Sequence, residues 1–385
     1  MPRHPQTSTS VREISGSVFT ALAHKLATFE GEVFPLHVGD TWLEPPEGCR
    51  MEDFRVETHP GMHAYTQPHG HPDLLDALGD LTTRRTGVET DKNDILITTG
   101  ATGGLGAIMG ALLEPGDEVL LLAPYWPLIA GIVRSFHGCP VAVPFLDVVD
   151  SPETAVERVR RHLTAKTIAV YINTPNNPTG RVIPQEWIEA VVEWAASEGL
   201  WIVADEVYEE LVYEGRHTYC RGLAPERTFS AHSFSKAYAM AGNRCGWVVG
   251  PRQSMIELQK VGTHSFYSTP TASQLAACRL LQDGYGEAWM AETRALYAQL
   301  GREAAESLGI DPPQGSTFLF FDAEPYLDDR GLEGFLNDCA DRGVFLAPGA
   351  SFGPYPTWVR VCFTAAPPEV TRRGVAVLTE LMRRT

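Results

Sequence analysis

The sequence predicts an α/β protein: a mostly parallel, doubly wound sheet with a smaller α+β domain beside it. From Asp94 to Gly250, short apolar runs rich in Val and Ile alternate with longer amphipathic stretches, as in strand-helix-strand units. Beyond residue 285, long helical patterns and isolated strand-like runs replace this alternation. The 385 residues, of which 44% are hydrophobic, are enough for two cores of unequal size.

The strands of the predicted sheet are short apolar runs bounded by turn residues. They are expected at Ile95–Thr98, Glu118–Leu122, Thr167–Ile172, Trp201–Ala204, Thr228–Ala231 and Trp247–Val249. Between two of these runs, Pro184 to Ser197 predicts a helix, because Trp187, Ile188 and Val191 recur at helical spacing and Gly199 follows.

The second unit is predicted from the C-terminal part of the chain. Helices are expected at Ala288–Leu308, at Gly331–Arg342 and at the C-terminus, and strands at Thr317–Phe321 and Trp358–Phe363. The first fifty residues are rich in Pro and Gly, so we expect them to lie over a domain rather than to form one. The expected division is a large domain of residues 51–284 and a small domain of residues 1–50 plus 285–385.

The charge of the chain argues against nucleic acid as a partner. A formal net charge of −17 would repel phosphate backbones and anionic lipid. The polar N-terminus is followed by no apolar run of signal-peptide or membrane-spanning length, so we expect no membrane association and a cytoplasmic location. The seven cysteines form no CxxC pair and are expected as free thiols; no metal site is expected.

In an open parallel sheet, ligands bind outside the carboxyl ends of the strands. After the first strand, Gly100, Ala101 and Thr102 open a helix whose free N–H groups could hold a phosphate, although a plain tight turn would look the same. The glycines fit no dinucleotide fingerprint, and no G-K-[ST] follows. After the next strand, Trp126 stands between prolines, as a ligand contact or as a core residue.

Two charged residues follow the later strands. Asp205 ends an apolar strand, where a carboxylate requires a cationic partner or caps a helix. Lys236 is the one lysine of five that follows a strand in a serine-rich turn; the alternative is an exposed surface lysine. Ser233 and Lys236 also fit the S-x-x-K pattern of serine acyl enzymes, but the chain has no K-T-G.

Taken together, these motifs resemble the class I/II aminotransferases, a fold type I family that depends on pyridoxal 5′-phosphate (PLP). The resemblance rests on the ordered set of Asn173 to Gly180, Asp205 to Tyr208, Ser233 to Lys236, and Arg360, and it extends over roughly residues 30 to 380. It implies transfer of an amino group from an L-amino acid to a 2-oxo acid.

The resemblance assigns roles around the PLP ring. Lys236 would form the Schiff base (the internal aldimine) with the cofactor aldehyde and later shuttle a proton. Asp205 would keep the pyridine nitrogen protonated, which makes the ring an electron sink. Tyr208 and Asn177 would donate hydrogen bonds to the ring hydroxyl oxygen. Trp126 would stack on the ring face.

It also assigns phosphate and substrate contacts. The phosphate would be held by Gly100, Ala101, Thr102, Ser233 and Arg244.

Tyr65 would reach the phosphate of a neighbouring subunit, which implies a homodimer with shared active sites, unless it is an ordinary loop aromatic. Arg360 would grip the substrate α-carboxylate in a bidentate manner. Gly39 would line the substrate entrance, and Asn177 and Trp126 would also border the substrate.

The sequence departs from the dicarboxylate-specific members of the family. They place an arginine before a Tyr-Ser-Asn-Pro stretch, where this chain has His264 to Pro270. Trp42 adds a bulky aromatic near the side-chain pocket. A neutral, aromatic or otherwise large amino acid is therefore favoured, with His264 as a conditional cation. Lyase, cyclase and oxidative chemistry share all these residues and stay open. A regulatory protein with a retired site is disfavoured, because every key residue is present.

Overall fold

The computed structural model describes residues 4, 6–12, 14, 20–282 and 285–383. Its largest element is a seven-stranded sheet in the order β1-β7-β6-β5-β4-β2-β3. The strands are β1 (Ile95–Thr98), β2 (Glu118–Ala123), β3 (Cys139–Pro144), β4 (Thr167–Asn173), β5 (Trp201–Asp205), β6 (Thr228–Ser233) and β7 (Gly246–Val249). All pairs from β6 to β3 are parallel, whereas β7 runs antiparallel to both of its neighbours.

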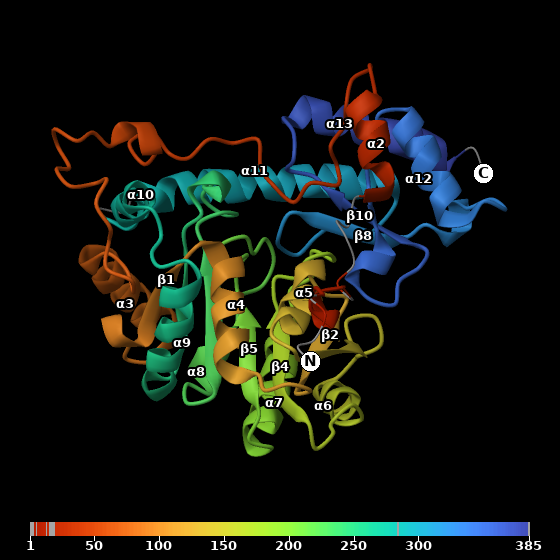
Figure 1. The fold of residues 1–385 in the computed structure, drawn as a ribbon. Coiled ribbons are helices and arrows are strands. Elements are labelled where there is room, and N and C mark those ends of the chain that lie inside the picture. The colour runs from red at the N-terminus through yellow and green to blue at the C-terminus, as the bar shows by residue number, and fades with distance from the viewer. Residues whose placement is uncertain (1–3, 5, 13, 15–19, 283–284, 384–385) are drawn as a thin grey trace.

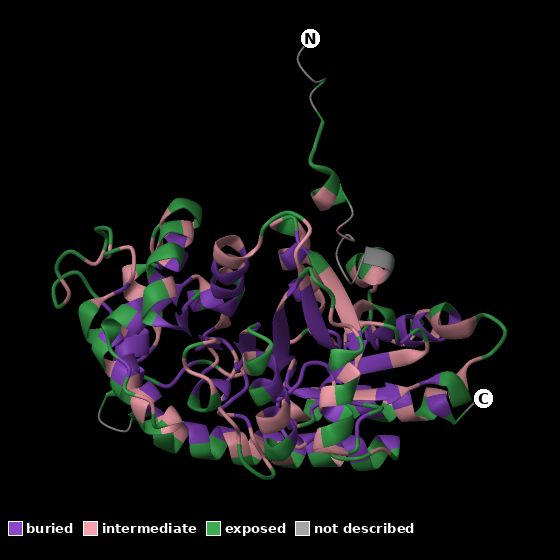
Figure 2. Ribbon diagram, turned by 90° about the horizontal axis from the view of Figure 1, so that it is seen from below, coloured by how far each residue is buried: buried purple, intermediate pink, exposed green. Residues whose placement is uncertain are grey.

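Helices cover both faces of this sheet (Figure 1). They are α3 (Pro72–Thr86), α4 (Gly100–Leu112), α5 (Pro127–Ser135), α6 (Pro152–Arg160), α7 (Gln185–Ser197), α8 (Cys220–Leu223) and α9 (Arg252–Ser265). The next helix, α10 (Thr271–Leu281), packs against α3 rather than on the sheet. Alternate residues of the central strands enter two separate cores: Ile172 packs on the α6–α7 side and Tyr171 on the α4–α5 side. Figure 2 shows the buried strands between helices whose outer faces are exposed.

The C-terminal part forms a smaller antiparallel sheet in the order β8-β10-β9. Its strands are β8 (Phe318–Asp322), β9 (Ala347–Pro348) and β10 (Trp358–Cys362), and the surrounding helices are α11 (Tyr285–Leu308), α12 (Gly331–Asp341) and α13 (Pro368–Met382). The N-terminal segment carries α1 (Thr9–Arg12) and α2 (Thr20–Thr28) and joins the small unit through a parallel bridge from Phe34 to Val344. The long α11 runs from α10 to the small sheet (Figure 1).

The predicted fold class is confirmed, with differences in detail. Each predicted strand is present within one or two residues of its expected bounds. The strand β3 was missed, because Pro140 and Pro144 argue against a strand; the structure places it at the sheet edge, where proline is tolerated. The described residues among the first fifty are irregular as expected, apart from the short helices α1 and α2.

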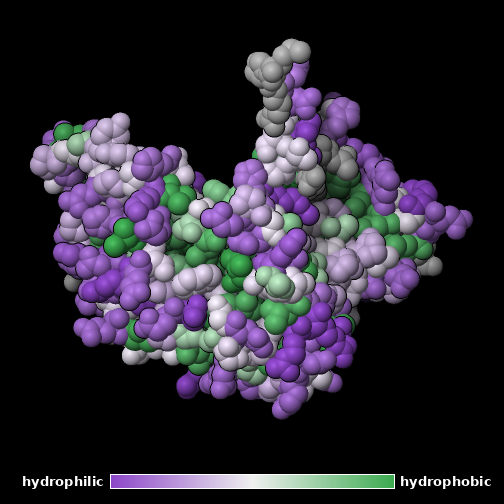
Figure 3. Space-filling model, turned by 60° about the horizontal axis from the view of Figure 1, so that its bottom comes forward, coloured by the Kyte–Doolittle hydropathy of each residue, from purple (hydrophilic) through white to green (hydrophobic). Residues whose placement is uncertain are grey.

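Two further expectations concern the surface and the thiols. Among the described residues, no helix has the length and apolar character needed to cross a membrane. All seven cysteines are free thiols, as predicted, and Cys139 is the exposed one. On the face shown in Figure 3, hydrophobic residues gather near the middle of the molecule and the outline is mostly hydrophilic.

Candidate active site

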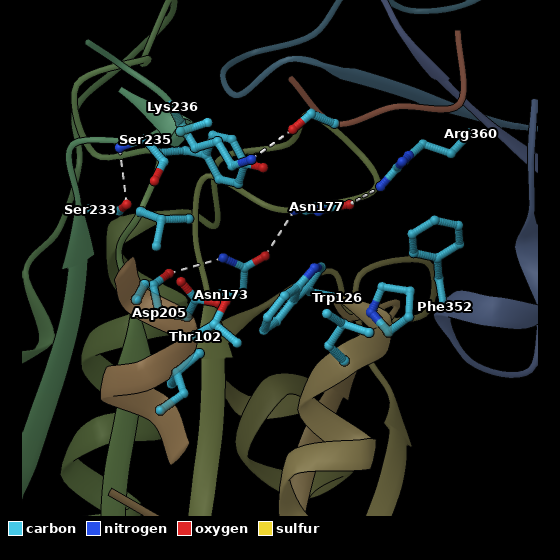
Figure 4. A pocket seen from close by; sticks show the side chains of 18 of the residues that line it. Thr102, Trp126, Asn173, Asn177, Asp205, Ser233, Ser235, Lys236, Phe352 and Arg360 are labelled. Carbon is cyan, nitrogen blue, oxygen red and sulfur yellow. Dashed lines mark hydrogen bonds between the residues drawn. The ribbon is translucent and has the colours of Figure 1, made fainter. Parts of the chain in front are cut away.

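A cavity of about 250 Å³ lies where the carboxyl ends of β4, β5 and β6 face the small sheet and the N-terminal segment. The predicted site residues that line it are Gly39, Ala101, Thr102, Trp126, Asn177, Asp205, Tyr208, Ser233, Lys236, Arg244 and Arg360. In Figure 4, Lys236 and Asp205 lie on one side of Asn177, and Arg360 lies on the opposite side. Two predicted residues, Gly100 and Tyr65, are outside this lining.

Lys236 is the only lysine among the described residues that line the cavity. It follows β6 and is half-buried, and its Nζ donates a hydrogen bond to the carbonyl oxygen of Gly39 at 2.6 Å. Burial lowers the pKa of Lys236, and the nearby Asp40 opposes this effect. A lower pKa raises the neutral fraction of the amine, which is the nucleophilic form.

Asp205 is buried at the end of β5. The phenol of Tyr171 donates a hydrogen bond to its Oδ2 at 2.5 Å, and the side-chain amide of Asn173 donates to its backbone oxygen at 2.9 Å. Burial raises the pKa of Asp205 from 3.8 to about 6, although the bond from Tyr171 favours the charged form. Its Oδ1 has no hydrogen-bond partner among the described residues. A buried carboxyl oxygen without a donor is costly, and a cationic ligand group would relieve that cost.

Arg360 reaches the cavity from β10. Its two terminal nitrogens donate to Oδ1 of Asn177 at 2.9 Å and to the carbonyl oxygen of His37 at 2.7 Å. The guanidinium carbon lies 4.2 Å from the ring centre of Phe318 and 4.9 Å from that of Phe352. Burial lowers the pKa of Arg360, and the cation is therefore poorly solvated and suited to an anionic ligand group.

Tyr208 lies beside this arginine, three residues beyond Asp205. Burial raises its pKa, whereas Arg360 and a hydrogen bond with Asn177 act in the opposite direction. The phenol is therefore protonated at neutral pH. It can donate a hydrogen bond into the cavity, which it lines.

The start of α4 and the turn after β6 form a cradle at one end of the cavity. The cap residue Thr99 provides no side-chain hydrogen bond, so the first N–H groups of α4 are available to an anion. Gly100 has φ +69°, and a Cβ there would lie 2.4 Å from a terminal nitrogen of Arg244. Gly100 thus permits the close approach of Arg244, although it does not line the cavity.

Arg244 and Ser233 complete this cradle. Arg244 donates to the carbonyl oxygens of Thr99 at 3.2 Å and Ala241 at 2.8 Å. The hydroxyl oxygen of Ser233 accepts from the backbone N–H of Ser235 at 3.0 Å. A positive side chain, a hydroxyl and a helix N-terminus therefore converge on one spot.

Tyr65 and His264 lie away from the cavity of their own chain. Tyr65 is 86% exposed, and its ring lies edge-on against Tyr267 at 5.0 Å. His264 is exposed on α9 and bonds to the carbonyl oxygen of Lys260 at 2.8 Å.

Several residues at the site received no predicted role, and three of them contact Asp205 or Arg360. Tyr171 and Asn173 lie two apart on β4, on the face that carries Asp205, and this spacing was the signal that could have identified them. Phe352 lines the cavity from the short helix at Gly349–Phe352, and nothing in the sequence marks it out.

The fold and this cavity define an enzyme of the fold type I class, with a half-buried lysine and a buried carboxylate lining one cavity. The family model for aminotransferase class I and II matches residues 32–378, and the chain therefore belongs to that family. It is a PLP-dependent aminotransferase.

Several relatives and solved structures are similar to the chain over most of its length. It is 32% identical to an aspartate/prephenate aminotransferase of Thermus thermophilus, covering 84% of this chain and 85% of that protein. It is 31% identical to an arginine–pyruvate transaminase of Pseudomonas aeruginosa, covering 84% and 83%. The solved structure of a double mutant of the Thermus thermophilus aspartate aminotransferase superposes with a TM-score of 0.91 at 29% identity, covering 98% of this chain and all of that one.

Proposed function

We propose that the enzyme uses this cavity to transfer an amino group from an L-amino acid with a neutral, aromatic or otherwise large side chain to a 2-oxo acid. The single observation that carries the proposal is the convergence of three charged groups on one cavity: the half-buried Lys236 amine, the buried Asp205 carboxylate and the buried Arg360 guanidinium. Each would be costly to bury without a ligand, and together they match the parts of PLP and an amino acid.

The side chains and backbone groups that line the cavity fit PLP. When bound, PLP supplies an aldehyde that takes up the amino group and a ring that draws electrons from the substrate Cα. Oδ1 of Asp205, which has no hydrogen-bond partner in the described part of the chain, would accept from the protonated ring nitrogen. Tyr208 and the amide nitrogen of Asn177 would donate to the ring hydroxyl oxygen, since Oδ1 of Asn177 is already occupied by Arg360. Trp126 would pack on the ring face.

The phosphate would be held by the cradle described above. Ala101 and Thr102 offer backbone N–H groups, Ser233 offers a hydroxyl and Arg244 a charge, while Gly100 keeps the cradle open.

The Lys236 amine would hold the cofactor at rest and, once displaced by substrate, carry a proton at Nζ between Cα and the cofactor. Its contact with the Gly39 carbonyl ties this amine to the substrate entrance.

The substrate carboxylate would bind Arg360. Among the described residues lining the cavity the cations are Lys236, Arg244 and Arg360, and each already has a role, so none is left for a second carboxylate. Apolar groups such as Leu105, Leu128 and Phe352 line the remaining wall. These features support a neutral or aromatic substrate. The relatives are named for aspartate, prephenate and arginine, amino-group donors and acceptors of several charge classes, so their names favour no single side chain for this chain.

We further propose that the enzyme is a homodimer in which Tyr65 completes the partner's phosphate site. Met51, Val56, Tyr65, Tyr267 and Tyr285 are exposed large hydrophobic residues, and Tyr65 and Tyr267 are in contact. Such side chains favour an interface. The division into residues 51–284 and 1–50 plus 285–385 and the cytoplasmic location stay predictions.

A half-reaction tests the proposed function. The PLP-loaded enzyme is mixed with one amino acid at a time, and the aminated cofactor and the 2-oxo acid are quantified. We expect stoichiometric formation of both with neutral or aromatic amino acids and little with aspartate. Release of ammonia, or a product that retains nitrogen in a new ring, would point instead to the lyase or cyclase alternative.

A further inference from the structure

Tyr171 has a position that packing alone does not explain. It lies on β4 opposite Val203 of β5, in the core on the α4–α5 side of the sheet, and its side chain is fully buried. Asp205 is two residues beyond Val203 and therefore points to the same face. The phenol of Tyr171 reaches diagonally across the strands and donates to Oδ2 of Asp205 at 2.5 Å.

The hydrogen bond from Tyr171 gives the two carboxyl oxygens of Asp205 different surroundings. Oδ2 is occupied by Tyr171, whereas Oδ1 has no partner in the described part of the chain. Tyr171 can serve only as the donor, because burial and the adjacent carboxylate raise its pKa far above neutrality.

Other charged groups also face Asp205. Glu206, its neighbour on the chain, raises the pKa of Asp205, whereas His232 on β6 and the backbone N–H of Val207 lower it. Tyr208 lies near Tyr171 as well. Of the side chains, Tyr171 is the one that donates a hydrogen bond to this carboxylate.

We propose that Tyr171 is a positioning residue for the transamination: it holds one oxygen of Asp205 and leaves the other directed at the ring nitrogen of PLP. The proposal rests on the proposed function, because it concerns the same cavity. It assigns the phenol a role beyond filling the core.

The substitution Tyr171→Phe removes the hydroxyl and retains the ring. Without the donor, the pKa of Asp205 should rise from about 6 to beyond neutrality, so that binding a protonated ring requires loss of a proton. A rise of about two pKa units, to about 8, corresponds to roughly tenfold weaker PLP binding at pH 7, because the ionised fraction of the carboxyl falls about tenfold. The same loss should appear in kcat, with little change in KM for the amino acid.

The pH dependence separates this role from a structural one. Above the pKa of Asp205 in both proteins the carboxyl is charged in each, so the ratio of the two Kd values for PLP should fall toward one as the pH is raised to about 9. A packing defect would leave that ratio unchanged. In addition, ¹⁵N-labelled PLP reports the protonation of its ring nitrogen by NMR, and Tyr171→Phe should shift this signal toward the neutral ring.

Three further comparisons complete the test. Tyr355→Phe is the matched control, because this buried tyrosine donates to Oδ1 of Asp147 at 3.0 Å and does not line the cavity; it should bind PLP like the wild type. In an Asp205→Asn background, Tyr171→Phe should cause no further shift of the ¹⁵N signal, because the effect acts through the carboxylate. Replacing Tyr171 with 3-fluorotyrosine, a stronger donor, should tighten binding, and this arm stands even if the phenylalanine variant does not fold.

The outcomes distinguish this inference from the proposed function. A wild-type protein that fails to bind PLP would overturn both. If the wild type binds PLP and transaminates, but Tyr171→Phe matches it in Kd and in the ¹⁵N signal, only the role of Tyr171 is overturned. A Kd ratio that is constant with pH, or an equal effect in the Asp205→Asn background, would also overturn it.

Discussion

The substitution Asp205→Asn should stabilise the cofactor-free protein while it abolishes catalysis. Asp205 is buried, and its Oδ1 has no hydrogen-bond partner among the described residues. Asparagine has nearly the same shape, and its side-chain oxygen can still accept the hydrogen bond from Tyr171. The substitution removes a buried negative charge whose proposed partner is the bound cofactor.

The size of the effect follows from the pKa of this carboxyl. Burial raises it from 3.8 to about 6, a difference of about two units, which corresponds to about 3 kcal/mol of unfolding free energy. The sign is that of an acid whose folded pKa is raised. The contribution of Asp205 to the free energy of unfolding is fully present below pH 3.8, where the carboxyl is protonated, and is lost as the pH rises through about 6. The stability gained by the asparagine variant should therefore be near zero at pH 4 and largest above pH 7.

Urea unfolding of the two cofactor-free proteins between pH 4 and 8 measures this difference. Adding PLP should then reverse the order at pH 8, because the wild type gains a pyridinium partner and the variant does not. The Cα deprotonation rate of the loaded variant should fall by several orders of magnitude. Equal stabilities at every pH, or a near-normal deprotonation rate, would refute the reasoning.

Three other substitutions test the remaining parts of the site. Lys236→Ala should abolish borohydride-dependent attachment of PLP, whereas Lys260→Ala, at an exposed position on α9, should not. Attachment of PLP to the Lys236→Ala variant would mean that another lysine is used. Arg360→Lys keeps the positive charge but loses the two-pronged guanidinium, so kcat/KM for an amino acid should fall about 10- to 100-fold. Turnover of the corresponding amine, which lacks the α-carboxylate, should be unchanged. An equal loss on both substrates would contradict carboxylate binding by Arg360. Mixing Tyr65→Ala with Lys236→Ala under subunit exchange should yield hybrid dimers with one intact site and activity above either parent; confirmed exchange without recovery would argue against a shared site.

The sequence was informative where local pattern and burial agree. Strands such as Glu118–Ala123 are buried on both faces and appear as continuous apolar runs, so their positions could be predicted closely. The strand Cys139–Pro144 could not be predicted from its sequence, because its prolines are tolerated only at the edge of a sheet. Which strand lies at the edge is known only once the sheet has assembled. The direction of β7 was equally hidden, since a short apolar run does not encode the sense in which it pairs.

For the site, the residues at strand ends were predictable and the supporting contacts were not. Lys236 and Asp205 stand out because a charged residue directly after an apolar strand requires an explanation. Tyr171 does not stand out, because tyrosine is common in strands. Its hydroxyl can be linked to Asp205 only when the register of β4 and β5, which places the two residues diagonally, is known. Phe352 and the carbonyl of His37 enter the site through long-range packing of the small unit against the large one.

The position of Asn177 links the two halves of the site. Because its Oδ1 accepts from Arg360, its amide nitrogen is left to point toward Tyr208 and the place proposed for the ring hydroxyl. The terminal nitrogens of Arg360 each carry two hydrogens, and the bonds to Asn177 and His37 use one from each. The guanidinium is therefore held in one orientation, and three N–H groups remain for a carboxylate: one on each terminal nitrogen and the one on Nε, which has no hydrogen-bond partner among the described residues. One amide thus sets the orientation of Arg360, the arginine on β10 proposed to bind the substrate. The same amide sets the proposed contact with the cofactor, which residues at the strand ends of the large sheet would hold.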